Sequence, residues 1–230
     1  MRLLITRPQP GANATASRVV EAGFDAMVMP LFVIKAVPWT LPDPTSYDAV
    51  MFTSANAVRS ARDALVQLSN LPFYAVGQAT ARALQIFKIP AFTGCAGVAE
   101  LMSDAARAGH RNVLWLAGED RVAVDIPPGL HLHPITVYRS DPLGAPAEFA
   151  TQVASCDAVL LHSPRAARYF SVLCEEHDLD KGNVTLAALS VAIAESAGPG
   201  WREIITAPTP NDAALLSRLQ SRFTSASRDP

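Results

Sequence analysis

The sequence predicts an α/β fold built of two similar units, and three observations carry this prediction. Short β-type runs alternate with helical runs along the 230-residue chain. The apolar residues of these runs are continuous rather than alternating, which is typical of parallel strands covered by helices on both faces. The phrase "DAVMFTSANAV" at 48–58 also returns as "DAVLLHSPRAA" at 157–167, so one local structure is expected twice.

Eight short runs are the expected strands. Each is apolar and is bounded by turn residues or by a helical segment. In chain order they are "LLIT" at 3–6, "AMVM" at 26–29, "AVMF" at 49–52, "FYAV" at 73–76, "VLWL" at 113–116, "AVLL" at 158–161, "TLAAL" at 185–189 and "EIIT" at 203–206. Because helical segments connect them, we expect a parallel sheet in each unit.

The repeated phrase predicts a strand, a tight turn and a helix in each copy. After the turn, apolar residues recur at helical spacing, namely Val58, Ala61, Leu65 and Leu68 in the first copy and Ala166, Phe170 and Leu173 in the second. Ser54 and Ser163 stand where a helix N-cap belongs. Pro164 occupies the first helical position, where its missing N–H costs nothing.

The repetition extends beyond this phrase. "FYAVGQATARAL" at 73–84 is answered by "LAALSVAIAESA" at 186–197, and "LLITRP" at 3–8 is answered by "VLWLAG" at 113–118. These matches indicate two units of about 110 residues, each close to the usual domain size. Two proline-bearing stretches, 31–48 and 140–146, are expected to connect the units.

Composition and charge exclude several classes of partner. The net charge is −2 and the Lys and Arg residues are scattered, which argues against nucleic acid and against a membrane surface. The N-terminus has a four-residue apolar run before Arg7 and Pro8, too short for a signal peptide or a spanning segment, so we expect a cytoplasmic protein. Cys95, Cys156 and Cys174 share no metal-like or redox spacing and are expected to be small hydrophobes.

The turns after the strands are candidates for binding anions. In a parallel α/β sheet every helix N-terminus lies at the carboxyl edge, where free N–H groups and the helix dipole attract carboxylate or phosphate. Arg7 and Arg121 stand in equivalent loops of the two units. For any one turn, capping alone is the commoner role of a serine such as Ser54 or Ser163, and the repetition across two units favours ligand binding only modestly, so both interpretations stay open.

Motifs that are missing narrow the function further. No G-x-G-x-x-G follows a strand, and neither G-x-x-x-x-G-K-[ST] nor a G-x-S-x-G elbow occurs, so dinucleotide, nucleoside triphosphate and serine-hydrolase functions lack their parts. His131 and His133 would share one strand face, but no third ligand is near in sequence. We therefore expect an exposed strand edge and no metal site.

Six motifs, taken in order, give a resemblance to a known family. They are "TRP" after the first strand, "FTSANAV", "AVGQATARAL", "LAGEDR", "ITVYRS" and "HSPRAARYF". Each motif alone is weak, but their order and spacing resemble uroporphyrinogen-III synthase. The match extends from Arg2 to about Leu219, nearly the whole chain.

The resemblance implies two flavodoxin-like parallel-sheet domains joined by a two-stranded linker, with the active cleft between the domains. In that arrangement residues 1–34 and 140–230 form a discontinuous domain 1, and residues 35–139 form domain 2. The two proline-bearing stretches lie where the chain would cross between domains.

The resemblance also implies a reaction. The family cyclises the linear tetrapyrrole hydroxymethylbilane to uroporphyrinogen III, inverting ring D through a spiro intermediate, in the biosynthesis of haem, sirohaem or cobalamin. No cofactor takes part, and the eight carboxylates of the substrate suit helix N-termini. Because the substrate also closes unaided to the uninverted isomer, the protein's main task is to impose geometry. We expect a monomer that makes at most a transient contact with the preceding pathway enzyme.

Site residues follow from the matched motifs. Tyr138 in "ITVYRS" matches a tyrosine near the family's cleft, where its hydroxyl is expected to assist the departure of water. The expected substrate contacts, through backbone or side chain, are Arg7, Ser54, Asn56, Thr80, Gly118, Arg121, Ser163 and Arg165.

Three positions depart from the family pattern. Ser190 and Ile193 stand where glycine and threonine are usual, and Ala117 stands where an arginine is usual, for which Arg121 or Arg165 could compensate. These departures keep an alternative open, a catalytically weak or inactive two-lobed protein of the same fold that binds a tetrapyrrole or another polycarboxylate. A nucleotide-dependent transferase would need a glycine-rich first turn, and "TRPQPG" is a poor one.

Overall fold

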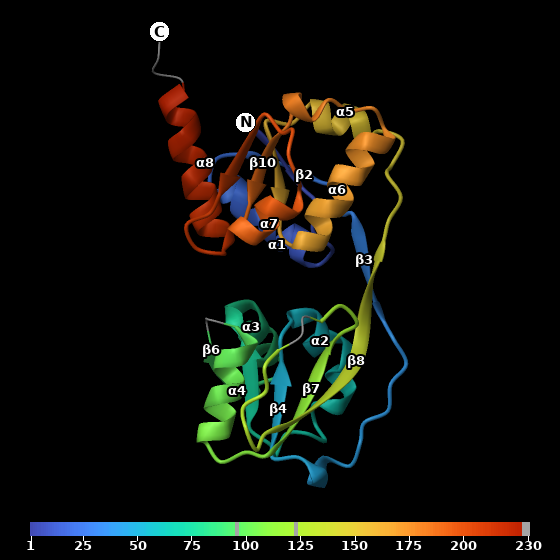
Figure 1. The fold of residues 1–230 in the computed structure, drawn as a ribbon, viewed down its shortest axis with the longest axis vertical. Helices are drawn as coiled ribbons and strands as arrows, with labels where there is room; N and C mark the ends of the chain where they lie inside the picture. Colours follow the sequence, from blue (N-terminus) through green and yellow to red (C-terminus); the bar gives the residue numbers. More distant parts are fainter. Residues whose placement is uncertain (95–96, 122–123, 227–230) are drawn as a thin grey trace. The chain divides into compact units, whose positions relative to one another are not determined.

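The structure is a computed structural model that describes residues 1–94, 97–121 and 124–226. The chain divides into two compact units, of which unit 1 comprises Met1–Val33 with Asp141–Pro230 and unit 2 comprises Ile34–Ser140. Each unit contains a parallel sheet flanked by helices, so the α/β prediction is confirmed (Figure 1). Cys95 lies outside the described residues. The expected ranges of two independent domains remain a prediction.

Unit 1 is built on a five-stranded sheet in the order β11-β10-β9-β1-β2. The strands are β1 (Arg2–Ile5), β2 (Asp25–Val28), β9 (Ala158–Leu161), β10 (Thr185–Ala188) and β11 (Glu203–Thr206), and all neighbours are parallel. Counted along the unit from β2, the order is 2-1-3-4-5. This is the flavodoxin-like order, which agrees with the expected fold class.

Helices cover both faces of this sheet. One face packs against α1 (Gly11–Glu21) and α8 (Asp212–Ala226), and the other against α5 (Phe149–Ala154), α6 (Pro164–Glu176) and α7 (Val191–Ser196). Successive residues of β1 alternate between the two faces: Leu3 and Ile5 join the α1/α8 core, and Leu4 joins the core on the other side. This double burial explains the continuous apolar runs of the sequence.

Unit 2 has a six-stranded sheet in the order β3-β8-β7-β4-β5-β6. The strands from β8 to β6 are parallel neighbours, and β3 runs antiparallel to β8, since residue 37 bonds to 137 and residue 31 bonds to 143. Its strands are β3 (Phe32–Ala36), β4 (Ala49–Phe52), β5 (Phe73–Val76), β6 (Ala91–Gly94), β7 (Asn112–Gly118) and β8 (His131–Pro142). On one face pack α2 (Ala55–Ser60) and α3 (Gly77–Ile86), and on the other α4 (Val98–Arg107). The short 3-10 helices are Pro44–Ser46, Arg62–Ala64 and, in unit 1, Lys181–Asn183.

The sequence repeat corresponds to equivalent places in the two sheets. Unit 2 reads β8-β7-β4-β5-β6 where unit 1 reads β2-β1-β9-β10-β11. The repeated phrase forms β4 and β9, the central strands of those series. The two units therefore share one strand order. The first strand of this series along the chain is β1 in unit 1 and β4, the counterpart of β9, in unit 2.

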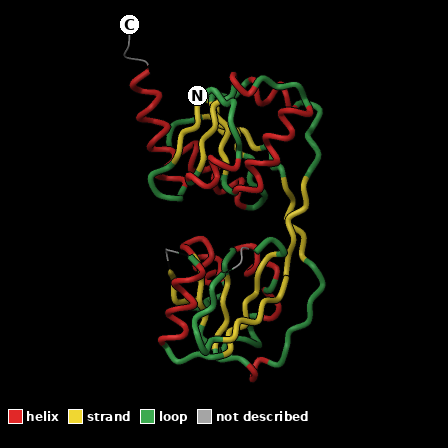
Figure 2. Tube along the Cα trace, viewed as in Figure 1, coloured by secondary structure: helices red, strands yellow, loops and turns green. Residues whose placement is uncertain are grey.

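The chain passes from one unit to the other twice, through β3 and through β8. These strands are hydrogen-bonded neighbours, and Figure 2 shows them side by side. The amide of Val37 donates to the carbonyl of Val137 at 3.2 Å, and that of Leu143 donates to the carbonyl of Leu31 at 2.8 Å. Both proline-bearing stretches thus contain strand residues rather than loop alone.

The eight expected strands omit β3, β6 and β8. Lys35 interrupts the apolar run of β3, and β6 is a four-residue edge strand whose Phe92 is exposed, so neither has the pattern of a buried strand. The repeat offers a signal for β6, since β6 is the counterpart of β11, which was expected.

The helix after β4 is shorter than expected. The predicted stripe reaches Leu68, but α2 ends at Ser60 and continues as the 3-10 turn Arg62–Ala64. Val58, Leu65 and Leu68 are nevertheless fully buried. The apolar spacing therefore predicted correctly which residues are buried, but not that the helix would end at Ser60. The helix after β9 extends over Pro164–Glu176, as expected. Within the described chain, no helix has the length and apolar character needed to cross a membrane.

Candidate functional site

Eight of the nine site residues of the sequence prediction lie at or after the carboxyl ends of strands, and the ninth, Tyr138, lies within β8 opposite the last residue of β7. Arg7, Ser163 and Arg165 belong to unit 1, and Ser54, Asn56, Thr80, Gly118, Arg121 and Tyr138 belong to unit 2. Each unit therefore has its own group, and each group is described by itself.

In unit 2, Tyr138 lies directly against Gly118. The two residues are partners in the β7–β8 ladder, beside an irregularity after Ala117, and the amide of Glu119 donates to the Tyr138 carbonyl at 2.9 Å. A Cβ atom added to Gly118 would lie 2.6 Å from Cζ of Tyr138 and 2.8 Å from its hydroxyl oxygen. A glycine is thus required for the half-buried tyrosine ring to occupy this place.

Arg121 is held beside the same glycine. Its Nη1 donates to the Gly118 carbonyl at 3.1 Å and to Oγ1 of Thr136 at 2.7 Å. Its guanidinium also lies 5.9 Å from the ring centroid of Trp115. The Trp115 indole in turn donates to Oγ1 of Thr53, the residue between β4 and its N-cap serine, at 3.2 Å.

The turn after β4 is ordered by its own side chains. Ser54 caps α2 by accepting the amide of Asn56 at 3.0 Å, which confirms the predicted N-cap. Asn56 accepts a hydrogen bond from Nη2 of Arg59 at 2.6 Å, and Arg59 lies within electrostatic reach of Tyr138. Thr80 is 3% exposed in the first turn of α3, so its side chain is buried. Arg59 was not expected, because its proximity to Tyr138 depends on tertiary structure.

In unit 1, Ser163 and Arg165 begin α6. The Ser163 hydroxyl accepts the amide of Ala166 at 3.1 Å, and Pro164 is the first helical residue, as predicted. Cζ of Arg165 lies 4.9 Å from the ring centroid of Phe32, a cation–π contact.

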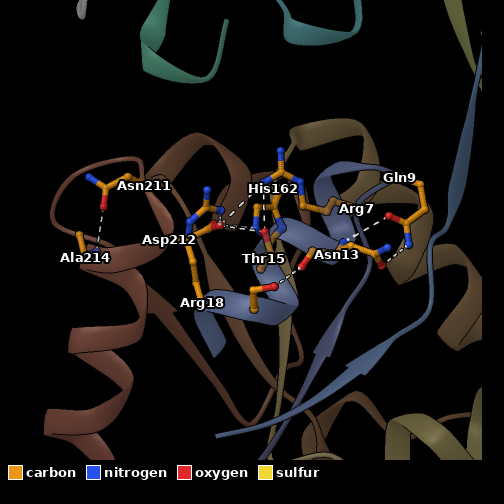
Figure 3. Close-up of polar contacts among 10 residues, drawn as sticks. Arg7, Gln9, Asn13, Thr15, Arg18, His162, Asn211, Asp212 and Ala214 are labelled. Carbon is orange, nitrogen blue, oxygen red and sulfur yellow. Dashed lines mark hydrogen bonds and ion pairs between the residues drawn. The ribbon is translucent and has the colours of Figure 1, made fainter. Parts of the chain in front are cut away.

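Arg7 belongs to a buried polar cluster that the sequence did not predict. The cluster comprises Arg7, Thr15, Arg18, His162 and Asp212, and Figure 3 shows the last four side chains converging. Oδ2 of Asp212 accepts from Oγ1 of Thr15 and from Nη1 of Arg18, each at 2.8 Å, and Oδ1 lies 3.0 Å from Nε2 of His162.

Arg7 joins this cluster in two ways. Its Nη1 donates to Oγ1 of Thr15 at 3.2 Å and lies 3.9 Å from Oδ2 of Asp212. The side chains of Asp212 and His162 are 5% exposed, whereas that of Arg7 is 32% exposed. A Cβ on Gly11 would lie 2.7 Å from Nε of Arg7, so the missing side chain leaves room for the guanidinium.

Burial and charge set the protonation states of the cluster. Burial alone would raise the pKa of Asp212, but hydrogen bonds from His162 and Thr15 and the charge of Arg7 outweigh it and hold the pKa below its ordinary value. Burial lowers the pKa of His162, the charge of Arg7 lowers it further, and the hydrogen bond to Asp212 opposes both. His162 is therefore neutral near pH 7, and its Nε2–H donates to an ionised carboxylate.

Two elements bring Asp212 and His162 together. His162 directly follows β9, and Asp212 is the first residue of α8, whose N-terminus is fixed by Oδ1 of Asn211 accepting the amide of Ala214 at 2.9 Å. The contact joins residues 50 positions apart, so no local pattern announces it. A carboxylate in the first turn of a helix after a strand was the only local signal.

The three departures from the family pattern are buried or structural. Ser190 caps α7 by accepting the amide of Ile193 at 3.4 Å, and Ile193 is 5% exposed in the core of unit 1. Ala117 is fully buried in the core that faces α4. These positions supply packing and a cap in this chain.

The histidine pair of β8 is not completed by further metal-ligating residues in the described part of the chain. His131 and His133 are exposed on β8, and His133 packs edge-on against Tyr47. Across residues 1–94, 97–121 and 124–226, no three His, Cys, Asp or Glu side chains gather in a way that could hold a metal ion.

Fold and site together define a class: a two-unit α/β protein with helix N-termini and arginines at the carboxyl edges of both sheets, the edge at which α/β proteins in general bind their ligands. The family model described as "Uroporphyrinogen-III synthase HemD" matches residues 13–217. The chain therefore belongs to the uroporphyrinogen-III synthase family.

Individual relatives agree with this assignment. The uroporphyrinogen-III synthase of Chlorobaculum parvum is 30% identical over 92 residues, 36% of this chain and only 37% of that protein. The crystal structure of uroporphyrinogen-III synthetase from Helicobacter pylori covers 96% of this chain and all of its own, with a TM-score of 0.65 and 19% identity. A mutant uroporphyrinogen III synthase from Thermus thermophilus covers both chains fully, with a TM-score of 0.55 and 15% identity. Because both structures are less than 20% identical to this chain, their similarity shows the fold alone.

Proposed function

We propose that this chain cyclises hydroxymethylbilane to uroporphyrinogen III with inversion of ring D. Membership of the family supports the reaction, and one observation supports the site: Tyr138 lies against Gly118 at the carboxyl edge of the unit 2 sheet, 2.6 Å from where a Cβ would be. The absence of a side chain at Gly118 lets the phenol ring pack directly against the backbone there. Arg121, bound to the carbonyl of that glycine, adds a positive charge beside it.

The proposed role of Tyr138 is to donate a proton as the terminal hydroxyl of the substrate leaves. The C–O bond breaks, water departs, and an electrophilic azafulvene remains. The substituted carbon of ring D attacks it, the spiro intermediate fragments, and the ring recloses with ring D inverted. The proton lost from ring D on reclosure balances the one donated by Tyr138. The net change is the loss of one water without oxidation or reduction, so the proposed reaction uses no cofactor.

Substrate binding is proposed to use carboxylate-binding groups of both units. In unit 1 these are Arg7, Arg165 and the N-terminus of α6 at Ser163. In unit 2 they are Arg121, the turn Ser54–Asn56 and the α3 turn that carries Thr80. Holding the carboxylates fixes the conformation of a flexible substrate, which favours one ring closure over the spontaneous one. We further propose that the protein acts in the cytoplasm and receives its unstable substrate through a transient contact with the preceding enzyme.

Isomer analysis of the product tests the reaction. Purified protein given freshly made hydroxymethylbilane is expected to yield mostly the type III isomer, whereas the buffer control yields type I. A product no different from the buffer control would reject the proposal. Binding of the substrate without isomer selection would instead identify the chain as a tetrapyrrole-binding protein that has lost activity.

A matched pair of variants tests the tyrosine. Tyr138→Phe removes the proposed donor and is expected to lower kcat by about 10²-fold or more, the usual contribution of a positioned acid, with an unchanged melting temperature. Tyr47→Phe is the control, because Tyr47 lies two residues before β4 (Ala49–Phe52), at the opposite edge of the same sheet. Equal kcat values for the two variants would show that Tyr138 contributes to packing and not to catalysis.

A further inference from the structure

Arg121 in unit 2 is oriented by neighbours that carry no charge. Its Nη1 donates to the carbonyl of Gly118 at 3.1 Å and to Oγ1 of Thr136 at 2.7 Å. Its guanidinium lies 5.9 Å from the ring centroid of Trp115. A carbonyl, a hydroxyl and an aromatic face each attract a cation without cancelling its charge. The side chain is therefore held in a defined place while its positive charge is retained.

The carboxylates of the described chain do not neutralise this arginine. Within residues 1–94, 97–121 and 124–226, the exposed guanidinium of Arg121 makes no ion pair with an Asp or Glu side chain. Arg18 in unit 1 is different, because it lies 2.8 Å from the carboxylate of Asp212. An arginine that is anchored and yet keeps its charge is suited to bind an anion from solution.

The groups that anchor Arg121 belong to the unit 2 sheet. Thr136 lies on β8 opposite Ala117 of β7, and Gly118 is the last residue of β7. Trp115 is 5% exposed in the core that faces α4, and its indole N–H donates to Oγ1 of Thr53 at 3.2 Å. Groups on strands hold a binding side chain in a better-defined place than groups on loops.

Gly118 connects this arginine to Tyr138. The Tyr138 hydroxyl lies 2.8 Å from where a Cβ of Gly118 would be, and the Gly118 carbonyl accepts from Arg121 at 3.1 Å. Standard bond lengths within one residue then place the hydroxyl oxygen and Nη1 of Arg121 within about 10 Å of each other. Tyr138 packs on the α2 face and Trp115 on the α4 face, so the two groups flank the end of β7.

We propose that Thr136 and Trp115 are positioning residues that hold the Arg121 guanidinium ready to receive a carboxylate of the substrate beside Tyr138. The inference rests on the proposed function, because it names the residues that prepare one of the proposed substrate contacts. The planar guanidinium pairs best with a carboxylate when its orientation is fixed. Fixing that orientation before the substrate arrives avoids an ordering cost on binding.

Direct binding to the full chain tests this role. The probe is a linear tetrapyrrole octacarboxylate with a methyl group in place of the terminal hydroxymethyl group, so it cannot lose water, and calorimetric titration measures its Kd. Thr136→Val removes the hydroxyl at nearly constant shape and is expected to weaken binding about three- to tenfold, the effect of releasing one ordered side chain. Thr136→Ser keeps the hydroxyl and is expected to bind like the unmodified protein.

A second threonine of unit 2 provides the matched control. Oγ1 of Thr45 donates to Asp43 at 2.8 Å in the 3-10 turn that precedes β4. Thr45→Val therefore loses a hydroxyl bond of similar length away from Arg121, and its Kd is expected to be unchanged. Equal losses in Thr136→Val and Thr45→Val would overturn the inference, as would equal binding by Thr136→Val and Thr136→Ser.

A double-mutant cycle separates positioning from stability. Arg121→Gln is expected to weaken binding, and adding Thr136→Val is expected to cause no further loss, because the positioned group is gone. Trp115→Phe has a smaller ring and no N–H, and its loss of affinity is expected to depend on Arg121 in the same way. Losses of equal size with and without Arg121 would overturn the inference, as would unchanged binding by Arg121→Gln.

The catalytic readout keeps the two proposals apart. With hydroxymethylbilane, Thr136→Val is expected to raise KM at unchanged kcat, as befits lost ground-state binding. A fall in kcat at unchanged KM would instead show that Thr136 acts through the geometry of Tyr138, against the inference. If the unmodified protein binds the probe but makes no type III product, the proposed reaction fails while the binding cycle still decides the role of Thr136. If it does not bind the probe, the inference fails.

Discussion

Thr53 in unit 2 and His162 in unit 1 occupy the same place in the repeated phrase, between the strand and the N-cap serine. The serines that follow have nearly the same backbone, with φ −153° and ψ 138° at Ser54 and φ −154° and ψ 152° at Ser163. Thr53 accepts a neutral hydrogen bond from Trp115, whereas His162 donates to the buried carboxylate of Asp212. The repeat thus preserves the backbone of the turn, but the turn is stabilised by a neutral hydrogen bond in unit 2 and by a bond to a charged carboxylate in unit 1.

The difference extends to the groups at each edge. In unit 2 a glycine and a rigid aromatic ring fix the geometry, and in unit 1 an ion cluster does so through a threonine. A ring fixed by shape suits a group that acts on the reacting atoms, and a charged cluster suits a group that binds an anion. The comparison fits the proposed division of roles, in which unit 2 supplies proton transfer and Arg7 of unit 1 binds a carboxylate.

The largest expected effect comes from removing the buried charge of unit 1. Asp212→Ala leaves the donors of Thr15, Arg18 and His162 without their acceptor, and we expect a loss of about 3–5 kcal/mol in the free energy of unfolding. Urea unfolding followed by far-UV circular dichroism measures it. The exposed ion-pair residue Asp63 provides the control, because Asp63→Ala is expected to change stability by less than about 0.5 kcal/mol. A similar small loss for Asp212→Ala would contradict the contrast between the edges.

The next effect contrasts the two glycines. Gly118→Ala pushes a methyl group into the Tyr138 ring, which cannot swing away as freely as a long side chain, and we expect kcat to fall about 10²-fold. Gly11→Ala meets the flexible guanidinium of Arg7, so we expect a rise of about two- to fivefold in KM with little change in kcat. Steady-state kinetics of both variants check the division of roles. The reverse assignment of kcat and KM effects would disprove it.

A pH dependence separates the two turns. The pKa of folded His162 lies below the ordinary value near 6.5, so between that value and the folded pKa the unfolded chain binds the extra proton. Stability is therefore expected to fall as pH falls from 7 to 5, by at most about 1.4 kcal/mol per pH unit for this one group. His162→Gln removes this contribution, and Thr53→Ser leaves it in place. An unchanged slope in His162→Gln would show that other groups cause the dependence.

The smallest effect tests what the two copies share. Ser54→Ala and Ser163→Ala each remove an N-cap, and we expect each to cost about 1 kcal/mol of stability. Ser103 lies within α4 with its hydroxyl on the Ala99 carbonyl, so Ser103→Ala serves as a control with little expected change. A marked inequality between the two cap variants would mean that the turns are less alike than their backbone angles indicate.

Much of the fold follows from the sequence, because burial on both faces of a sheet leaves continuous apolar runs and because caps are local. β1, β4 and β9 and the starts of α2 and α6 are of this kind. The edge strand β6 was not predicted, because an edge strand has one exposed side. The strand β3, which passes between the units, was not predicted because Lys35 interrupts its apolar run. The end of α2 was placed too late, because the 3-10 turn that follows the helix buries Leu65 as well as a continued helix would.

The site follows from the sequence only in part. The caps Ser54 and Ser163 were predicted from local chemistry and are confirmed, and the substrate roles of the nine residues remain proposals. Asp212 and His162 were missed because their contact depends on how α8 packs against the end of β9. The spacing of residues along the sequence carries no information about that packing. A charge brought into a core by tertiary structure is visible only when the partners are seen together.

The place of β1 in its sheet has a consequence for how the polypeptide is made. β1 pairs with β9, and the Arg2 amide meets Asp157, 155 residues further along, with all of unit 2 in the intervening segment. During synthesis β1 can pair early with β2 and pack against α1, but its pairing with β9 must wait until most of the polypeptide has left the ribosome. Closing so long a loop is slow, so refolding of unit 1 after dilution from denaturant should lag behind that of unit 2.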